Sequence, residues 1–224
     1  MKLKTIVLHA LLAFIAFGCA PARQKAIYTE KLEPVVIAKQ PVRIFIDPGH
    51  GGKDEGAKST TGPRCFEKSF NLTTALQLEK YLKEAGYETV LTRGDDTFIP
   101  LRIRSSFANG NRADLFVSVH YNASESAKAE GIEVYYFESG DQREIKSKKL
   151  AQSVMNRLIL NTKSKGRGVK GGNLAVLRET KMPAILVEGG FMTNANELAK
   201  IKDPEYMRKV AQSIAQGVTD YLNN

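Results

Sequence analysis

The chain has 224 residues, of which 42% are hydrophobic and 25% are charged, and its formal net charge is +9. This length and apolar content suffice for one well-packed domain, and the lack of low-complexity tracts excludes a mainly disordered protein. The positive charge favours an anionic partner, such as anionic lipid or an acidic cell-wall polymer. Because the basic residues are scattered and form no recognised nucleic-acid-binding motif, we expect no nucleic acid partner.

Residues 1–22 are typical of a secretory signal peptide. Lys2 and Lys4 precede an apolar run over residues 6–17 that is too short to span a bilayer. Two processing routes fit this segment. In one, Phe17-Gly18-Cys19 resembles a lipobox, and a lipid on Cys19 anchors the protein to a membrane; in the other, cleavage follows Ala20-Pro21-Ala22. Both routes predict export to the periplasm or the cell envelope.

Residues 23–40 are polar and charged without clear periodicity, so we expect a linker there. The only other cysteine is Cys65, and it is not expected to form a structural disulfide with Cys19, which lies in the signal region. A single domain is therefore predicted over residues 41–224.

Within residues 41–224, strand-like and helix-like apolar patterns alternate. The predicted strands cover residues 42–47, 87–91, 114–119, 131–137, 174–177 and 184–187, and the predicted helices cover residues 66–85, 101–111, 144–161 and 206–222. This alternation predicts a single α/β domain with a mostly parallel, twisted sheet and helices on both faces. Residues 162–173 hold four glycines and four basic residues, and we expect a basic loop there that contacts an anionic ligand.

Four residues that can carry chemistry follow predicted strands or open a helix. His50 lies in the Pro/Gly-rich turn after the first strand, and His120 follows the strand that ends at residue 119. Glu67 opens a helix, and Glu188 follows the strand that ends at residue 187. The carboxyl ends of parallel strands share one edge of the sheet, so these residues are expected to meet there. Two histidines and a carboxylate suit zinc with an open position for water, and a further carboxylate can act as general base.

Each of the four residues also has an ordinary structural explanation. His120 could pack under a loop, and Glu67 could be an acidic residue favoured by the helix dipole. Glu188 could pair with one of the many basic residues. The joint placement of His50 and His120, the two histidines that remain after removal of the signal, with two acidic residues favours a site.

These residues lie in five stretches with a fixed order. They are Ile46-Asp47-Pro48-Gly49-His50-Gly51-Gly52, Glu67-Lys68 with Asn71-Leu72, Leu91-Thr92-Arg93, Ser118-Val119-His120-Tyr121-Asn122-Ala123, and Pro183-Ala184-Ile185-Leu186-Val187-Glu188-Gly189-Gly190-Phe191 with Asn194. Across residues 42–222 the chain thereby resembles the zinc-dependent N-acetylmuramoyl-L-alanine amidases of bacterial cell-wall remodelling and daughter-cell separation.

The resemblance implies one zinc ion bound by His50, Glu67 and His120, with Glu188 as the catalytic residue. It implies hydrolysis of the amide between N-acetylmuramic acid and the L-alanine of the stem peptide, with peptidoglycan as the partner of a monomeric enzyme. Asp47 and Asn122 are close to the ligands in sequence, and we expect them to orient these ligands.

The chain departs from the family pattern at Cys65, where a cysteine is unusual. A thiolate is a good zinc ligand, so Cys65 competes with Glu67 for this assignment, and we favour Glu67 because it coincides with both the motif and the helix start. Some relatives carry a helical insert that plugs the zinc site until an activator removes it. The interval between residues 122 and 187 is compact here, so we expect no such plug, and no separate wall-binding domain is visible.

Three functions from different classes remain open at this point. The first is the zinc amidase, the second is a wall-binding lipoprotein that has lost catalysis, and the third is a metallopeptidase that cuts elsewhere in the stem peptide. The intact set of two histidines and two glutamates argues against the second function. The first and third functions use the same kind of site, so the residues alone distinguish them poorly.

Overall fold

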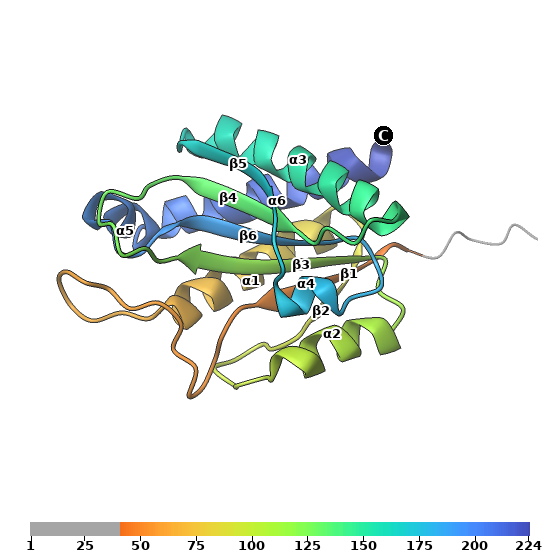
Figure 1. Cartoon of the computed structure of the whole chain (residues 1–224), viewed down its shortest axis with the longest axis horizontal. Coiled ribbons are helices and arrows are strands. Elements are labelled where there is room, and N and C mark those ends of the chain that lie inside the picture. The colour runs from red at the N-terminus through yellow and green to blue at the C-terminus, as the bar shows by residue number, and fades with distance from the viewer. Residues whose placement is uncertain (1–40) are drawn as a thin grey trace, which may run out of the picture. The chain divides into compact units, whose positions relative to one another are not determined.

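The computed structural model of the protein describes residues 41–224 (Figure 1). The predicted signal peptide, its Cys19 and the predicted linker lie outside the described residues. The strands are β1 (Arg43–Pro48), β2 (Glu88–Leu91), β3 (Leu115–Asn122), β4 (Ile132–Tyr136), β5 (Gly166–Gly171) and β6 (Ala184–Phe191). The helices are α1 (Glu67–Glu84), α2 (Leu101–Gly110), α3 (Gln142–Thr162), α4 (Ala175–Arg178), α5 (Ala195–Ile201) and α6 (Pro204–Asn223).

All of these strands belong to one sheet with the order β2-β1-β3-β6-β4-β5. β1 pairs in parallel with β2 and β3, and β3 pairs in parallel with β6. β4 runs antiparallel to β6, whereas β5 runs parallel to β4. The predicted α/β domain with a mostly parallel sheet is therefore confirmed.

Helices cover both faces of the sheet because successive strand residues point to opposite sides. Ile44 and Val117 belong to the apolar core that is packed with α1, α3 and α6. Their chain neighbours Phe45 and Phe116 belong to a second core that is shared with α2 and α4. In Figure 1, α4 lies in front of the sheet, while α1 and α6 lie behind it. None of the helices within residues 41–224 combines the length and the apolar character that crossing a bilayer requires.

Two predicted elements were wrong, and both lie in the same part of the chain. Residues 174–177 were expected to form a strand, but they lie at the start of the one-turn helix α4. A run of four apolar residues does not distinguish a short buried helix from a strand. The loop expected over residues 162–173 contains the strand β5, which forms the edge of the sheet and buries few side chains. Its glycines concealed it, since they are depleted in strands.

The helix α5 was not predicted, although its start carries a recognisable signal. The side chain of Asn194 accepts hydrogen bonds from the backbone N–H groups of Asn196 and Glu197, which caps the helix. An asparagine followed three residues later by glutamate resembles a capping box. The strands β3 and β6 also extend further than expected, so His120 and Glu188 lie within them rather than after them.

The contact between α3 and α6 depends on a glycine. A Cβ atom on Gly217 would lie only 2.5 Å from the Cα of Val154, which is backbone and cannot rotate away. We expect Gly217→Ala to lower the free energy of unfolding by about 1–3 kcal/mol through overpacking, as measured by urea denaturation. Gly110→Ala is the matched control, because a Cβ there would meet nothing within 4 Å. Equal effects of both substitutions would show that α3 and α6 are not so closely packed.

Candidate metal centre

His50, Glu67 and His120 come together at the carboxyl edge of the sheet. His50 lies in the turn after β1, Glu67 is the first residue of α1, and His120 lies near the end of β3. One carboxylate oxygen of Glu67 lies 3.0 Å from His50 Nε2, and the other lies 2.8 Å from His120 Nδ1. One ligand atom from each of the three residues can be chosen so that all lie within 4.8 Å of one another. The three residues that the sequence brought forward as ligands therefore form one cluster.

The ring of His50 is oriented by Asp54. Nδ1 of His50 lies 2.8 Å from an Asp54 carboxylate oxygen, so Nε2 is the nitrogen that faces Glu67. A histidine that binds a metal through one nitrogen usually donates the other N–H to a carboxylate, which selects the tautomer. Sequence reasoning missed Asp54, although an acidic residue four positions after His50 in the same turn was a usable signal.

Two glycines are required by the cluster itself. A Cβ atom on Gly49 would lie 2.1 Å from Cε1 of His120, so the ring rests directly on the backbone of the turn. A Cβ atom on Gly56 would lie 2.6 Å from both a carboxylate oxygen of Glu67 and Cδ2 of His50, and Gly56 also has a φ of +67°. Side chains at these positions would fill the space that the two rings and the carboxylate occupy.

The electrostatics of the cluster fit a cation. Burial opposes ionisation of Glu67, but the two histidine rings outweigh it and hold the pKa of the Glu67 carboxyl well below its usual range. Burial likewise lowers the pKa of His50, but Glu67 and Asp54 outweigh this effect and raise it. A buried carboxylate between two imidazole nitrogens is a donor set that suits one divalent ion, which would take the place of the ring protons.

Glu188 lies beside the cluster, on the next strand. It is the register partner of His120 in the β3–β6 pair. Its Oε2 atom is enclosed and has no hydrogen-bond partner within residues 41–224. Burial, and then the negative charges of Glu67 and Glu133, raise the pKa of Glu188 well above its usual range. A carboxylate in this setting has a strong tendency to accept a proton.

Cys65 does not join the cluster, so the alternative in which it replaces Glu67 as a ligand is not supported. Its side chain packs against the main apolar core. Asp47 and Asn122, which were expected to orient the ligands, form their side-chain hydrogen bonds with other residues. Asp47 binds Arg104 and Ser118, and the side-chain amide of Asn122 donates to Glu133.

The turn that carries His50 is held by two buried arginines. Arg104 donates to a carboxylate oxygen of Asp47 at 2.9 Å and to the carbonyl oxygens of Pro48 and His50, each at 2.7 Å. Arg93 donates to the carbonyl oxygens of Pro48 and Gly49, at 3.0 and 2.7 Å. His50 itself adopts a φ of 60°, which is uncommon for a residue with a side chain. Sequence reasoning missed the role of Arg104, because an arginine in a helical pattern usually indicates a solvated face.

A cavity of about 350 Å³ opens next to the cluster, between the sheet and the helices α2 and α4. Its lining includes His50, His120 and Asp54 together with the apolar side chains of Phe98, Leu101, Leu174, Val176 and Leu186. The cluster therefore has an apolar wall on the side of α2 and α4. The rings of His50 and His120 are 25% and 17% exposed, so both remain accessible from this side.

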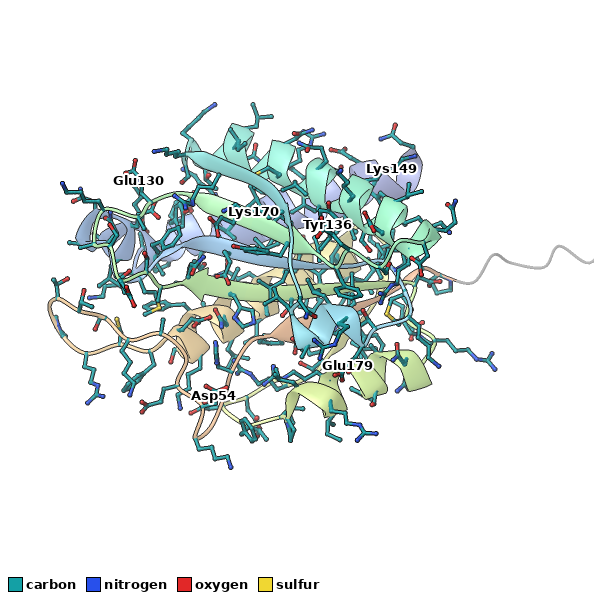
Figure 2. All side chains as sticks on the ribbon, viewed as in Figure 1. Asp54, Glu130, Tyr136, Lys149, Lys170 and Glu179 are labelled. Atoms are coloured by element: carbon teal, nitrogen blue, oxygen red, sulfur yellow. The ribbon has the colours of Figure 1, made fainter. Side chains whose placement is uncertain are left out.

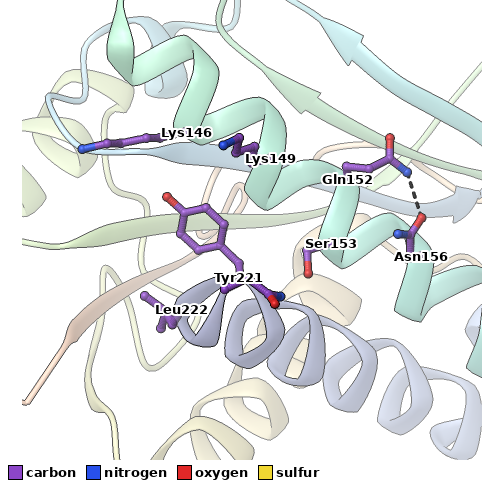
Figure 3. Close-up of a pocket in the computed structure, with 8 residues that line it drawn as sticks. Lys146, Lys149, Gln152, Ser153, Asn156, Tyr221 and Leu222 are labelled. Atoms are coloured by element: carbon purple, nitrogen blue, oxygen red, sulfur yellow. Dashed lines mark hydrogen bonds between the residues drawn. The ribbon is translucent and has the colours of Figure 1, made fainter.

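A second hollow lies between α3 and α6 and has a different character (Figure 3). Its volume is about 750 Å³, and Lys146, Lys149 and Tyr221 are among the residues that line it. Along α3, Gln152 donates a hydrogen bond to Asn156, one turn further on, at 2.8 Å. None of the side chains that line it is a histidine, cysteine, aspartate or glutamate, so they provide no typical metal-ligand set.

Comparison with known proteins identifies the family. The profile of the N-acetylmuramoyl-L-alanine amidase family matches residues 44–220. The chain belongs to this family. It is 38% identical over 208 residues to the amidase LytC of Bacillus subtilis (strain 168), a match that covers 93% of this chain and 40% of LytC. The chain thus spans less than half the length of this amidase.

Solved amidase structures share the fold. The N-acetylmuramoyl-L-alanine amidase of Clostridium difficile 630 is 40% identical, with a TM-score of 0.79, over 83% of this chain and 99% of that chain. The catalytic domain of the amidase CwlV from Bacillus (Paenibacillus) polymyxa var. colistinus is 42% identical, with a TM-score of 0.76, over 81% of this chain and 98% of that domain. The described domain is thus similar to amidase catalytic domains over nearly their whole length.

The contact between Asp54 and His50 predicts a measurable contribution to metal affinity. Asp54→Asn keeps the shape of the side chain but removes the charge that orients the ring, so we expect zinc affinity to fall by about 10–100-fold. Competition with a chromogenic chelator measures this directly. Asp220→Asn, which removes a charge paired with Arg157 outside the cluster, should leave the affinity unchanged. Unaltered affinity in Asp54→Asn would contradict the assigned role.

Proposed function

We propose that this chain is a zinc-dependent N-acetylmuramoyl-L-alanine amidase, which hydrolyses the amide between N-acetylmuramic acid and the L-alanine of the stem peptide. The observation that carries this proposal is the cluster of His50, Glu67 and His120 with Glu188 in register beside it. Membership of the amidase family and the similarity to amidase catalytic domains support the same reaction.

In the proposed mechanism, His50, Glu67 and His120 hold the zinc ion. A zinc ion at this position would acidify the attacking water and stabilise negative charge on the substrate carbonyl oxygen. Glu188 accepts a proton from the attacking water at its carboxylate and then delivers that proton to the amide nitrogen, which leaves as the amine of L-alanine. The raised pKa of Glu188 makes it a better acceptor for this proton than an exposed glutamate.

The chain organisation in this proposal is a signal peptide over residues 1–22, a linker over residues 23–40 and a catalytic domain over residues 41–224. The protein is exported and works as a monomer on peptidoglycan in the periplasm or cell envelope, in wall remodelling and daughter-cell separation. The cluster is complete within one chain, so the proposed site needs no residue from a second subunit. Either a lipid on Cys19 or cleavage after Ala22 would complete export.

Digestion of purified peptidoglycan tests this function against the two alternatives. We expect the domain of residues 41–224 to release stem peptides that begin at L-alanine, identified by mass spectrometry. It should do so without any added protein, because both histidine rings are partly exposed and the interval between β3 and β6 holds only β4, α3, β5 and α4. Shortened stems would indicate a peptidase, and unchanged material a binding protein. Activity only with a partner would show that access is controlled.

The two kinds of site residue should respond differently to substitution. We expect Glu188→Ala to retain about one zinc per chain while turnover falls by about 10²–10⁴-fold, the usual contribution of a general base. His120→Ala should lose the metal, because it removes a ligand. Metal analysis of the purified variants, together with circular dichroism to confirm folding, distinguishes the roles. Zinc loss in Glu188→Ala would show that Glu188 is a ligand.

A further inference from the structure

A second buried carboxylate lies on the far side of Glu188 from the metal cluster. Glu133 of β4 is the register partner of Glu188 in the β4–β6 pair, and its side chain is only 3% exposed. One of its oxygens accepts hydrogen bonds from Tyr135 and Asn122, at 2.7 and 3.0 Å. Tyr135 and Asn122 thus hold Glu133 in place, and its other oxygen is available to anchor further groups.

The groups anchored on Glu133 are cations from the edge strand β5. Arg167 Nε and Lys170 Nζ each donate to the other oxygen of Glu133, at 2.5 Å. The Arg167 guanidinium also lies over the ring of Phe191, 5.1 Å from its centroid, which fixes its plane. Two positive charges thus share one carboxylate oxygen, and Glu197 contributes further negative charge near Arg167. Glu133 therefore holds Arg167 and Lys170 in place, although its single charge does not neutralise both of them.

Both cations retain capacity for a ligand. The side chains of Arg167 and Lys170 are 34% and 37% exposed, so they face solvent as well as Glu133. Within residues 41–224, the Nη2 group of Arg167 donates no hydrogen bond. A guanidinium and an ammonium that are fixed side by side match the geometry of a carboxylate ligand.

The distance from the metal cluster limits which part of a substrate can reach these cations. His120 lies on β3 and Glu133 on β4, two strand spacings away, which corresponds to about 10 Å. An extended peptide advances about 3.3–3.6 Å per residue. A peptide whose first amide lies at the cluster therefore brings a carboxylate of its second or third residue to Arg167 and Lys170.

The side of the cluster that faces α2 and α4 is mainly apolar, in contrast to the charged side with Arg167 and Lys170. The cavity there is walled by apolar residues of α2, α4 and the adjoining loops, including Phe98, Leu101 and Leu174. Figure 2 shows Lys170 and Asp54 on opposite sides of strands β3 and β6. The muramoyl part of the substrate carries no charge at the amide, whereas the stem peptide carries carboxylates. Charge complementarity then determines the direction in which the substrate crosses the site.

We propose that Arg167 and Lys170 form a carboxylate-binding subsite for the second or third residue of the stem peptide, and that the apolar cavity receives the muramoyl side. This inference rests on the proposed amidase function. In this proposal, Arg167 and Lys170 determine substrate specificity. The enzyme is then expected to prefer stem peptides with free carboxylates over stem peptides whose carboxylates are amidated.

The test compares two soluble muramoyl tripeptides. In one, the carboxyl groups of the second and third residues are free acids, and in the other they are carboxamides. We expect kcat/KM of the zinc-loaded protein to be about 10–100-fold higher for the free acid, the range for a hydrogen bond to a charged group. In the double variant R167Q/K170Q, which keeps hydrogen-bonding side chains beside Glu133, this ratio should fall to near one, mainly through KM for the free acid.

Arg157→Gln is the matched control, because Arg157 is 37% exposed and pairs with Asp220 between α3 and α6. Its ratio should equal that of the wild type. If the double variant does not fold, Lys170→Gln alone should lower the ratio, and added salt should lower the wild-type ratio.

Each outcome is decisive. Equal cleavage of both substrates by the wild type overturns the subsite and leaves the amidase function standing. A preference that survives in the folded variants also overturns the subsite. Cleavage of neither substrate overturns the amidase function and the inference together.

Discussion

The cluster of His50, Glu67 and His120 depends on the turn between Asp47 and His50, and that turn depends on two buried guanidinium groups. Arg104 and Asp47 are each only 1% exposed, and their side chains form an ion pair inside the domain. Burying charges is costly, and removal of one partner from such a pair typically destabilises a protein by about 3–5 kcal/mol. Here the same guanidinium also holds carbonyl oxygens of the turn. Folding energy is thereby used to keep His50 in a backbone conformation that it would otherwise rarely adopt.

The register of the sheet positions three further side chains of the site. β3 and β6 place His120 and Glu188 opposite each other, and β4 adds Glu133 in the next position. Backbone pairing of the strands up to this level, with a register shift only after His120, limits how far these three side chains can move apart. Glu67 enters from α1, and its carboxylate joins the two histidine rings. The site thus combines one constrained turn, one helix start and a rigid row of strand residues.

The side chains that meet at the sheet edge were predictable from the sequence, whereas the residues that support them were not. His50, Glu67, His120 and Glu188 each occur at or near a strand end or helix start, which is a local feature. The role of Arg104 arises only from tertiary packing, because nothing near it in the chain indicates that its side chain is buried against residues 57 and 56 positions away. Its companion Arg93 belongs to one of the family stretches, but that stretch does not reveal which carbonyl groups it holds.

The edge strand β5 could not be predicted from the sequence either, because its structure also depends on tertiary contacts. Its glycines and basic residues are typical of a loop, and only pairing with β4 makes residues 166–171 a strand. The four-residue helix α4 was equally hidden, since one turn carries no periodicity. Long amphipathic helices such as α6 were found because their pattern repeats over several turns.

The position of β5 at the edge of the sheet has a consequence for which residues of such a protein can change during evolution. The residues of the cluster come from the turn after β1, from α1 and from β3, and Glu188 comes from β6, whereas Arg167 and Lys170 come from a strand with only one neighbour. Exchange of residues on that outer strand leaves the backbone pairing of the central strands intact. The proposed recognition residues and the proposed catalytic residues therefore lie on different elements, so the former could vary over evolutionary time while the latter are retained.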